Sequence, residues 1–466
     1  MTYLTRVTTP QLPLIHRGKV RDSFRIDDET RLIVTTDRIS AFDRVLDNGI
    51  PHKGAVLNSL AAFWFERTRE IVESHFVRSV DPCASIVREA VPIRVEMVVR
   101  GYLAGSAWRR YKEGHREICG VVLPDGLGPN ARLPEPVVTP TTKEDVGHDR
   151  DVTPDEVVSL GLATRDQYDE MARTALELFT AGSKMLAARG LLLADTKYEL
   201  GLIDGRLALI DEIHTPDSSR FWDGERWEHD PSTAESLDKE YVRAWLMEHR
   251  DGDDIPFFLP DHVVAETSRR YLELYERVTG SPLTPRPPSD EGPGHRLYAN
   301  LVREGVIRDA WVAVVMGSPH DIEHCRKIAA VLEGYGVMVD LRVMSAHKNG
   351  EDIARLAEEY NGSIEPGAVI AVAGLSNGLG GALAASLDVP VLSCPPFSDR
   401  ADMLVNVNSS LMMPSGVPAA TVIRPVEAAA AALRSLNLHR LRGRFREEIR
   451  RTKEDLRAAD RAIRGR

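Results

Sequence analysis

Short apolar runs alternate with polar turns in the first half of the chain. Two such runs, at 191–194 and 207–210, flank a turn that contains Asp204 and Gly205. An Asp-Gly pair between two apolar runs is a strong β-hairpin signal. In the segment 92–99 the apolar residues fall at alternate positions, which predicts a further half-buried strand.

Longer segments carry apolar residues at helical spacing. One begins near Val56, a second spans 155–190 as two helices, and a third spans 261–278. The segment 123–156 is rich in Pro, Gly, Asp and Thr and predicts a long loop. Loops of this length in compact domains are often lids over functional sites, and Lys143 is the best candidate for chemistry in this one.

A Pro- and Gly-rich stretch after residue 279 predicts a domain boundary. We expect a first domain at 1–280, a linker at 281–308, a second domain at 309–436 and a C-terminal helix at 437–466. A long loop within one domain is the alternative interpretation of the linker. Beyond it, buried strands alternate with helices, which predicts a parallel sheet covered by helices.

Composition and charge narrow the class of protein. The chain has 466 residues and a net charge of -11, which argues against a general nucleic-acid binder. Its four cysteines form no CxxC pair, so we expect a reducing compartment, no disulfide framework and no zinc site. No apolar run resembles a signal peptide or reaches the length of a membrane span, so we expect a cytoplasmic protein without a membrane partner.

The predicted hairpin carries charged residues close together. Pairing of its strands would bring together Asp195, Glu199 and Asp211, with Lys197 among them. Several carboxylates on one sheet are costly unless a cation neutralises them, and a few hard oxygen ligands suit Mg2+ that carries a nucleotide phosphate. A solvated acidic hairpin is the alternative interpretation.

A glycine flanked by Arg17, Lys19 and Arg21 predicts a turn that lies over nucleotide phosphates. It is not a P-loop, because the spacing GxxxxGK[ST] is missing, and a basic surface turn is the alternative interpretation. Arg100 precedes a small-residue turn that ends at Ser106, where the backbone can approach an anion closely. Four more candidate ligand contacts follow a predicted strand: Asp37, Arg38, Ser40 and Asp43.

In the second half, three loops follow predicted strands, at 317–321, 345–349 and 374–381. Ligands of parallel sheets bind at the carboxyl ends of the strands, and glycines before a helix expose N–H groups to a phosphate. His347 lies in the second loop, and an imidazole can move a proton at a ring carbon near neutral pH. A hydrogen-bonded structural histidine is the alternative interpretation.

Seven motifs of the first half occur in the order typical of one family. They are RGKVRD, TDRISAFD, KGAVLN, RGYLAGSAW, PEPVVTPTTK, ADTKYELG and DEIHTPDSSRFW. Over residues 10–280 the chain resembles SAICAR synthetase, which joins a carboxylate to aspartate with ATP. The resemblance implies an ATP-grasp-like domain within a chain of α/β and α+β class.

The resemblance also implies roles for individual residues. Those that would bind ATP are Lys19, Arg21, Lys143, Glu199 and Asp211, and the last two would also hold Mg2+. Lys197 and Asp195 would be catalytic. The residues that would bind the other substrates are Asp37, Arg38, Ser40, Arg100, Ser106, Asp217, Ser218 and Arg220.

Five motifs of the second half, MGS-x-x-D, SAHK, AGLSNGLG, SCPP and MPSGVPAATV, are similar to AIR carboxylase over residues 310–436. SAHK and SNGLG resemble the class that uses CO2 directly, without ATP or biotin. The resemblance implies a flavodoxin-like three-layer α/β/α domain in which His347 shuttles the proton displaced from the aminoimidazole. The residues that would bind the nucleotide are Ser318, Asp321, Ser345, Lys348, Ser376, Asn377 and Gly378.

Two positions depart from the carboxylase pattern. His320 stands where a second Ser or Thr is usual, and Leu375 stands where an Arg is usual. These departures leave open a second domain that serves assembly without catalysis.

Together the two resemblances imply a bifunctional enzyme of de novo purine biosynthesis. The second domain would convert AIR and CO2 to CAIR, and the first would ligate CAIR to L-aspartate with ATP and Mg2+, giving SAICAR, ADP and phosphate. A non-catalytic second domain and a secondary-metabolism paralogue that acts on a related azole carboxylate are the alternatives.

The tail carries an apolar seam of Leu438, Leu441, Phe445, Ile449, Leu456 and Ile463, with eleven basic and five acidic residues. Since the resembling carboxylases are oligomeric, we expect this helix to pack on a neighbouring subunit of a homo-octamer. A nucleic-acid or membrane-surface role is the alternative interpretation.

Overall fold

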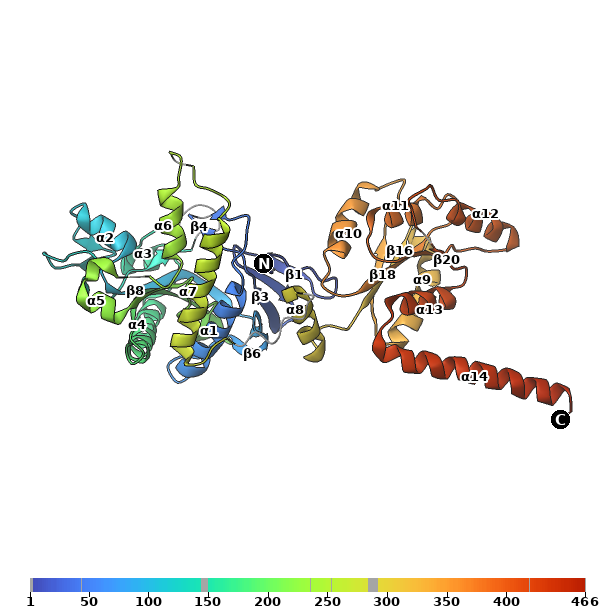
Figure 1. Ribbon diagram of the computed structural model, residues 1–466, viewed down its shortest axis with the longest axis horizontal. Helices are drawn as coiled ribbons and strands as arrows, with labels where there is room; N and C mark the ends of the chain where they lie inside the picture. Colours follow the sequence, from blue (N-terminus) through green and yellow to red (C-terminus); the bar gives the residue numbers. More distant parts are fainter. Residues whose placement is uncertain are drawn as a thin grey trace. The chain divides into compact units, whose positions relative to one another are not determined.

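The computed structural model describes residues 3–42, 44–143, 150–234, 236–252, 254–283, 292–418 and 420–465. Contacts between residues divide the chain into two compact units (Figure 1). Unit 1 comprises Met1–Arg6 and Leu14–Leu297, and unit 2 comprises Val7–Pro13 and Tyr298–Arg466. None of the described helices is long and apolar enough to cross a membrane.

Unit 1 is built on two antiparallel sheets. The first has the order β1-β2-β3-β7-β6, formed by β1 (Leu14–Arg17), β2 (Arg21–Arg25), β3 (Thr30–Thr35), β7 (Ala84–Arg88) and β6 (Phe76–Asp81). The second has the order β11-β8-β13-β14, formed by β11 (Arg132–Val138), β8 (Val91–Tyr102), β13 (Leu191–Ile203) and β14 (Arg206–Ile210). In this sheet β12 (Thr141–Thr142) pairs with β8 and β15 (Ser219–Asp223) pairs with β13. Two short pairs lie in connections: β4 (Ser40–Ala41) with β5 (Arg44–Val45), and β9 (Glu117–Ile118) with β10 (Val121–Val122).

Helices cover these sheets (Figure 1). They are α1 (Lys53–Thr68), α2 (Gly105–Lys112), α3 (Pro154–Ser159), α4 (Arg165–Ala187), α5 (Gly224–His229), α6 (Glu240–Glu248), α7 (Asp261–Thr279) and the short η1 (Pro231–Thr233). α4 packs on β13 and β8, and α1 packs on α7. The helices predicted near Val56, at 155–190 and at 261–278 are confirmed.

The predicted hairpin is confirmed as β13 and β14. Ile203 pairs with Arg206, so Asp204 and Gly205 form a two-residue turn, and both have positive φ, 51° and 76°. Positive φ at both positions is what a type I′ turn requires. β13 is longer than the hairpin, and it also pairs with β8 and β15, which makes it the central strand of its sheet.

The long loop predicted at 123–156 is partly strand, because β11 and β12 pair with β8. Pro134 and Pro136 disguised β11 in the sequence pattern. This strand lies at the edge of its sheet, where a residue without an N–H is tolerated. Residues 144–149 of the predicted lid lie outside the described residues.

Unit 2 contains a parallel sheet of order β17-β16-β18-β19-β20, which is the flavodoxin-like order 2-1-3-4-5. Its strands are β16 (Trp311–Met316), β17 (Met338–Val343), β18 (Gly367–Val372), β19 (Val391–Ser393) and β20 (Ala420–Thr421). Its helices are α9 (Ile322–Gly334), α10 (Glu351–Asn361), α11 (Gly378–Ser386), α12 (Arg400–Leu411), α13 (Pro425–Leu436), α14 (His439–Ile463) and the short η2 (Pro319–Asp321). One core joins α9 and α13 to the sheet and a second joins α10 and α11 to it, so the predicted three layers are confirmed.

The linker predicted at 281–308 is not irregular throughout. Helix α8 (Gly292–Arg303) forms within it, and Leu297 and Leu301 are fully buried one turn apart. The Pro- and Gly-rich composition before α8 masked this helical spacing. The division between the two units falls inside α8, after Leu297.

The N-terminal segment Val7–Pro13 belongs to unit 2. The hydroxyl of Thr9 donates a hydrogen bond to the carboxyl group of Glu365, which is buried. Gln11 donates to the carbonyl of Arg308 and accepts from its N–H, each at 2.8 Å. Burial raises the pKa of Glu365, so its hydrogen-bond donors matter for stability.

Replacing Thr9 with Val should destabilise unit 2, because the buried Glu365 would lose a hydrogen-bond donor. Loss of a partner for a buried polar group costs about 1–3 kcal/mol. Hydrogen exchange of 367–372, measured by mass spectrometry, should become faster, while exchange in β13 should stay the same. Unchanged exchange in β18 would contradict this, and the exposed Thr180→Val is a matched control.

Candidate active sites

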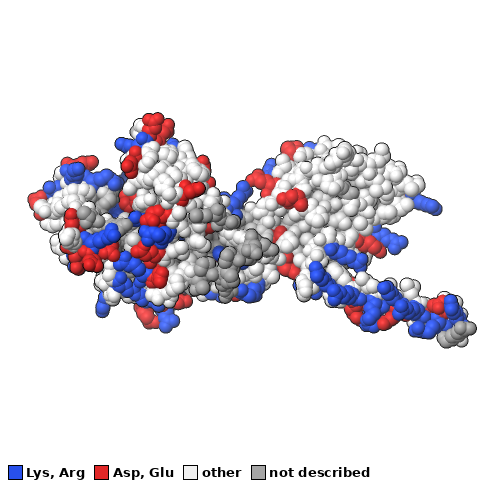
Figure 2. Space-filling view, viewed as in Figure 1, with Lys and Arg blue, Asp and Glu red and all other residues white. Residues whose placement is uncertain are grey.

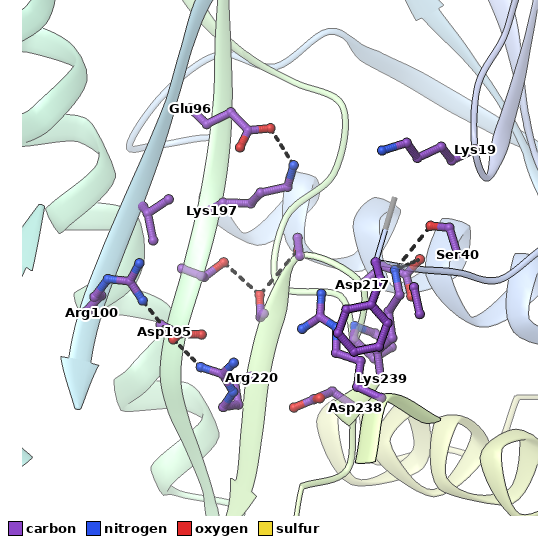
Figure 3. Close-up of a pocket in the computed structure, with 18 residues that line it drawn as sticks. Lys19, Ser40, Glu96, Arg100, Asp195, Lys197, Asp217, Arg220, Asp238 and Lys239 are labelled. Carbon is purple, nitrogen blue, oxygen red and sulfur yellow. Dashed lines mark hydrogen bonds and ion pairs between the residues drawn. The ribbon is translucent and has the colours of Figure 1, made fainter. Parts of the chain in front are cut away.

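The central strand β13 carries charged residues on one face. Asp195, Lys197 and Glu199 occupy alternate positions, so their side chains point to the same side of the sheet. Across the ladder, Asp195 pairs with Arg100 of β8 and Glu199 pairs with Glu96. Asp195 and Lys197 of this face line a cavity of about 400 Å³, together with the loops around it (Figure 3).

At one end of the cavity, Asp195 is held by two arginines. Its Oδ2 accepts hydrogen bonds from Arg220 at 2.5 Å and from Arg100 at 3.4 Å (Figure 3). Arg100 also donates to the hydroxyl of Thr139 at 2.9 Å and lies 3.5 Å from the Ser106 hydroxyl. Two guanidinium groups meet at one carboxylate, and guanidinium groups are well suited to bind an anion. Arg220 also lies 3.7 Å from Glu240.

Gly105 allows Arg220 to reach this position. Its φ is +56°, and a Cβ at Gly105 would lie 2.7 Å from a guanidinium nitrogen of Arg220. A larger residue would strain the backbone and displace the guanidinium group. The small-residue turn that we predicted as an anion contact therefore acts by seating an arginine.

Glu96, which the sequence prediction missed, faces Glu199 across the two strands. Like charges in such a pair repel, and Lys197 bridges them, with its Nζ 2.5 Å from Glu96 and 3.6 Å from Glu199. Lys143 pairs with the other oxygen of Glu199. Burial opposes the charged form of Lys197, but Glu96 and Glu199 raise its pKa above the ordinary value.

Asp211 follows β14 and lies apart from the main cavity. Its Oδ1 is 3.0 Å from Arg21, which also contacts Glu212 at 2.7 Å. Arg21 and Asp211 line a separate, much smaller cavity of about 20 Å³. The hairpin therefore does not gather all its predicted acids at one point: Asp195 is held by arginines, Glu199 by lysines and Asp211 by Arg21.

Glu199 and Asp211 still fit the chemistry of a magnesium site. Among the residues that the structure describes, no three His, Cys, Asp or Glu side chains are grouped to hold a metal. Mg2+ bound to a nucleotide needs only one or two carboxylates, because phosphate and water supply the other ligands. Glu199 is paired with Lys143 and Asp211 with Arg21, so each carboxylate lies where a positive charge is favourable.

Two predicted substrate contacts have structural roles. Asp37 is buried, does not line the cavity, and accepts N–H groups of Leu4 and Gly54 at 2.8 Å each. Arg38 donates to the carbonyl of Lys19 at 3.2 Å and shapes the turn between β1 and β2. Lys19 itself lines the cavity, as do Ser40 and Ser218, whereas Asp43 lies outside the described residues.

The opposite wall of the cavity is formed around Asp217. This carboxylate accepts hydrogen bonds from Lys53 at 2.8 Å and from Tyr271 at 2.9 Å. Burial would raise the pKa of Asp217, but Lys53 and Lys239 hold it well below the ordinary value. Lys239 and Arg243 also line this wall, and no sequence motif had indicated them.

In unit 2 a cavity of about 690 Å³ lies at the carboxyl ends of the parallel strands. The loops after β16, β17 and β18 line it, as predicted, together with Pro396–Ser398 after β19, which the prediction missed. The predicted residues that line it are Ser318, Asp321, Ser345, His347, Lys348 and Ser376.

Asn377 and Gly378 lie behind the wall of this cavity. Asn377 is buried, caps α11 through the N–H of Gly380 at 3.2 Å and donates to the hydroxyl of Ser410 at 2.8 Å. A Cβ at Gly378 would lie 3.0 Å from the ring of His347, so glycine lets the imidazole lie against α11.

The two departures from the carboxylase pattern both line the cavity. His320 places its Nδ1 3.0 Å from the Ser318 hydroxyl. Leu375 is exposed and has a φ of +56°, and its N–H donates to Asn406 at 2.7 Å.

A family model described as SAICAR synthetase matches residues 14–255, which is more than half of the chain. The chain belongs to the SAICAR synthetase family. A second model, described as AIR carboxylase, matches residues 311–458, so this SAICAR synthetase carries a carboxylase domain in the same polypeptide.

Several relatives are similar over the synthetase part. A phosphoribosylaminoimidazole-succinocarboxamide synthase of Bacteroides thetaiotaomicron is 48% identical over 275 residues, which cover 57% of this chain and 87% of the relative. A putative synthase of Agrobacterium fabrum is 44% identical and covers 65% of this chain and 98% of the relative. The structure of the Saccharomyces cerevisiae SAICAR synthase complexed with SAICAR has a TM-score of 0.54 and 32% identity, over 60% of this chain and 99% of that one.

Replacing Glu96 with Gln should lower kcat/KM of the SAICAR synthetase by about 100-fold, as for loss of one preorganised charged partner. Lys197 would lose its 2.5 Å ion pair and move toward Glu199. A steady-state assay of SAICAR formation measures the effect, with the exposed Glu117→Gln as control. An unchanged kcat/KM in a folded Glu96→Gln protein would contradict the role of this acid.

Proposed function

We propose that unit 2 carboxylates AIR with CO2 to give CAIR, and that unit 1 ligates CAIR to L-aspartate with ATP and Mg2+. The products of the ligation are SAICAR, ADP and phosphate. The proposal is carried by the match of one chain to both families, and the residues of each match line a cavity of their own. The chain is thus a bifunctional enzyme of purine biosynthesis.

The ligation begins with activation of a carboxylate. A carboxylate is a poor electrophile at neutral pH, and transfer of a phosphoryl group to it creates a leaving group. Such transfer depends on positioning and charge neutralisation. Lys19 and Lys143 are the proposed contacts to ATP, and Arg21 is paired with both Asp211 and Glu212. Glu199 and Asp211 are the residues that would hold Mg2+, and the ion would neutralise phosphate charge when bound.

CAIR is the second substrate of the ligation, and its proposed position is the end of the cavity formed by Arg100 and Arg220. Arg100 and Arg220, oriented by Asp195, are the proposed contacts to the phosphate and carboxylate of CAIR. Lys197 keeps its positive charge between Glu96 and Glu199, and this charge stabilises the negative charge that develops on the transferred phosphoryl group. The amine of aspartate then attacks the acyl carbon, and phosphate leaves.

The carboxylation is assigned to the cavity of unit 2. His347 is the proposed group that takes the proton displaced from C4 of the aminoimidazole. Ser318, Asp321, Ser345 and Lys348 come from loops at the strand ends, where nucleotides bind in folds of this order. CO2 is the co-substrate in this proposal, and no biotin takes part. A non-catalytic second domain and a secondary-metabolism paralogue are not favoured, since both families match.

A coupled assay tests both reactions with the full chain. AIR, bicarbonate, ATP, Mg2+ and aspartate should together yield SAICAR, and omission of any one should abolish it. His347→Asn should lower carboxylation of AIR by about 100-fold or more, because the proton acceptor is lost. Ligation of supplied CAIR should persist in this variant. Carboxylation at the wild-type rate would contradict the role of His347.

We further propose that unit 2 assembles into a homo-octamer. Leu404, Val405, Leu411 and Met412 of the α12 region have exposed fractions between 55% and 81%. In α14 only Leu441 is buried. Apolar patches of this kind mark protein contacts. Because the resembling carboxylases are oligomeric, we propose that a second copy of unit 2 covers this patch.

Some of the basic residues of α14 are paired with acidic residues of the same helix. Basic residues line this helix with acidic ones among them (Figure 2). Arg450 pairs with Glu447 and Glu454, and Arg444 pairs with Glu448. Since these arginines are neutralised within the helix, packing against protein is the better use of its surface.

Replacing Leu404 and Leu411 with Asp should dissociate this assembly, because the charged side chains would have to be desolvated at the contact. Light scattering coupled to size exclusion measures the mass, and the exposed Leu160→Asp of unit 1 is the control. A wild-type protein with the mass of a monomer would contradict the proposal.

A further inference from the structure

Helix α12 places one polar side chain between two loops that line the cavity of unit 2. Asn406 lies in the second turn of this helix and is one of the residues that line the cavity. It is buried, with an exposed fraction of only 3%. Sequence patterns had not indicated it, and the proposed carboxylation gives it no role.

The carboxamide of Asn406 uses both its donor and its acceptor side. Its Oδ1 accepts the N–H of Leu375 at 2.7 Å, in the loop after β18. Its Nδ2 donates to the carbonyl of Pro396 at 2.7 Å, in the loop after β19. Since β18 and β19 are neighbours in the sheet, one side chain joins the loops at the ends of two adjacent strands. A backbone N–H on one side and a carbonyl on the other fix the orientation of the amide.

The loop after β18 depends on this contact and on a second one from α12. Leu375 has a φ of +56°, a conformation that a residue with a side chain keeps only when its surroundings hold it. Its side chain is 74% exposed and gains little from packing, whereas its N–H is held by Asn406. Two residues on, the N–H of Asn377 donates to the hydroxyl of Ser409 at 2.7 Å. Ser376, which lines the cavity, thus lies between two backbone groups that are bound to α12.

The loop after β19 is held by the same helix. The Oδ1 of Asp402 accepts from Nδ2 of Asn406 at 3.0 Å, and its Oδ2 accepts the N–H of Ser398 at 2.9 Å. Pro396 and Ser398 both line the cavity, and each is bound to α12 at one backbone group. Gly374 lets the amide come this close, because a Cβ there would lie 3.2 Å from Nδ2 of Asn406.

These contacts reach the proposed proton acceptor through the start of α11. The N–H of Gly378 donates to the carbonyl of Ser376 at 2.8 Å. A Cβ at Gly378 would lie 3.0 Å from the ring of His347, so the imidazole lies against the same loop that Asn406 holds. A shift of this loop would change both the position of Ser376 and the space around His347.

We infer that Asn406 is a positioning residue for the carboxylation, which holds the loops after β18 and β19 in the geometry that the reaction needs. The inference rests on the proposed carboxylase function of unit 2. Asn406 acts through these loops, because its amide is engaged by Leu375, Pro396 and Asp402. Misplacement of reacting groups by about 1 Å can lower a rate by about 100-fold, so loss of this amide should be visible in the kinetics.

Replacing Asn406 with Asp should lower kcat/KM for carboxylation of AIR by about 10- to 100-fold. The introduced carboxylate keeps the acceptor for Leu375, but it loses the donor to Pro396 and faces the like charge of Asp402. Asn406→Leu, which has a similar shape and no hydrogen-bonding group, should cause a comparable loss. Ligation of supplied CAIR by unit 1 of the same polypeptide should be unchanged. The exposed Asn437→Asp, at the end of α13, is the matched control.

The pH profile of Asn406→Asp separates a hydrogen-bonding role from a packing role. Burial and the neighbouring Asp402 should raise the pKa of the introduced carboxyl group. Once protonated, this group is neutral and can donate a hydrogen bond to Pro396 again. The rate of Asn406→Asp relative to wild type should therefore rise as the pH falls, while the relative rate of Asn406→Leu should stay constant. The other titratable side chains that line the cavity are the same in all three proteins: His320, Asp321, His324, His347 and Lys348.

Hydrogen exchange of β16 and β18, measured by mass spectrometry, shows that unit 2 of each variant is folded. A wild type that does not carboxylate AIR would overturn the carboxylase function itself. An active wild type, together with folded Asn406→Asp and Asn406→Leu proteins of unchanged kcat/KM, would overturn the inference alone. A loss in Asn406→Asp that persists undiminished at low pH would also overturn it, because the hydrogen bonds of the amide would then not be what the loops require.

Discussion

Compensation of charge along β13 is the constraint on which unit 1 depends. This strand places an acid, a lysine and a second acid on one face of a central position in the sheet. Buried charges persist only when they are paired. The partners come from separate segments: Arg100 and Glu96 from β8, Arg220 from β15, and Lys143 from the residue after β12. The loops and edge strands around β13 are arranged so that each charge meets its counterpart.

This arrangement changes how an anionic ligand enters. In the proposed function, phosphate and carboxylate groups of a substrate would compete with Asp195 or Glu199 for cations that are already in place and oriented. Binding then exchanges one anionic partner for another, so the cations are never left buried without compensation. When no substrate is bound, Asp195 accepts hydrogen bonds from both guanidinium groups and so keeps them in position.

Sequence patterns predicted correctly those elements whose structure depends mainly on neighbouring residues. The Asp204–Gly205 turn and the helical spacing of α1, α4 and α7 were predictable for this reason. Glu96 was missed because its importance depends on the register of β8 against β13, which no local pattern reveals. Asp37 lies in a motif, but only the fold shows that its carboxylate is used by backbone N–H groups. Lys239 lies in no motif, and it is brought to the cavity by packing of α6.

The segment Val7–Pro13, which belongs to unit 2, stands between two stretches of unit 1 in the order of the chain. Thr9 and Glu365 are separated by 356 positions, so these partners leave the ribosome far apart in time. Unit 1 can fold while the chain is still being translated. Residues 7–13 can pack against the rest of unit 2 only after residues 298–466 have been synthesised. Separation of the two activities into independent genes would therefore require more than a cut after α8. The carboxylase gene would have to carry its own copy of this short N-terminal segment, or be permuted so that the segment follows α14.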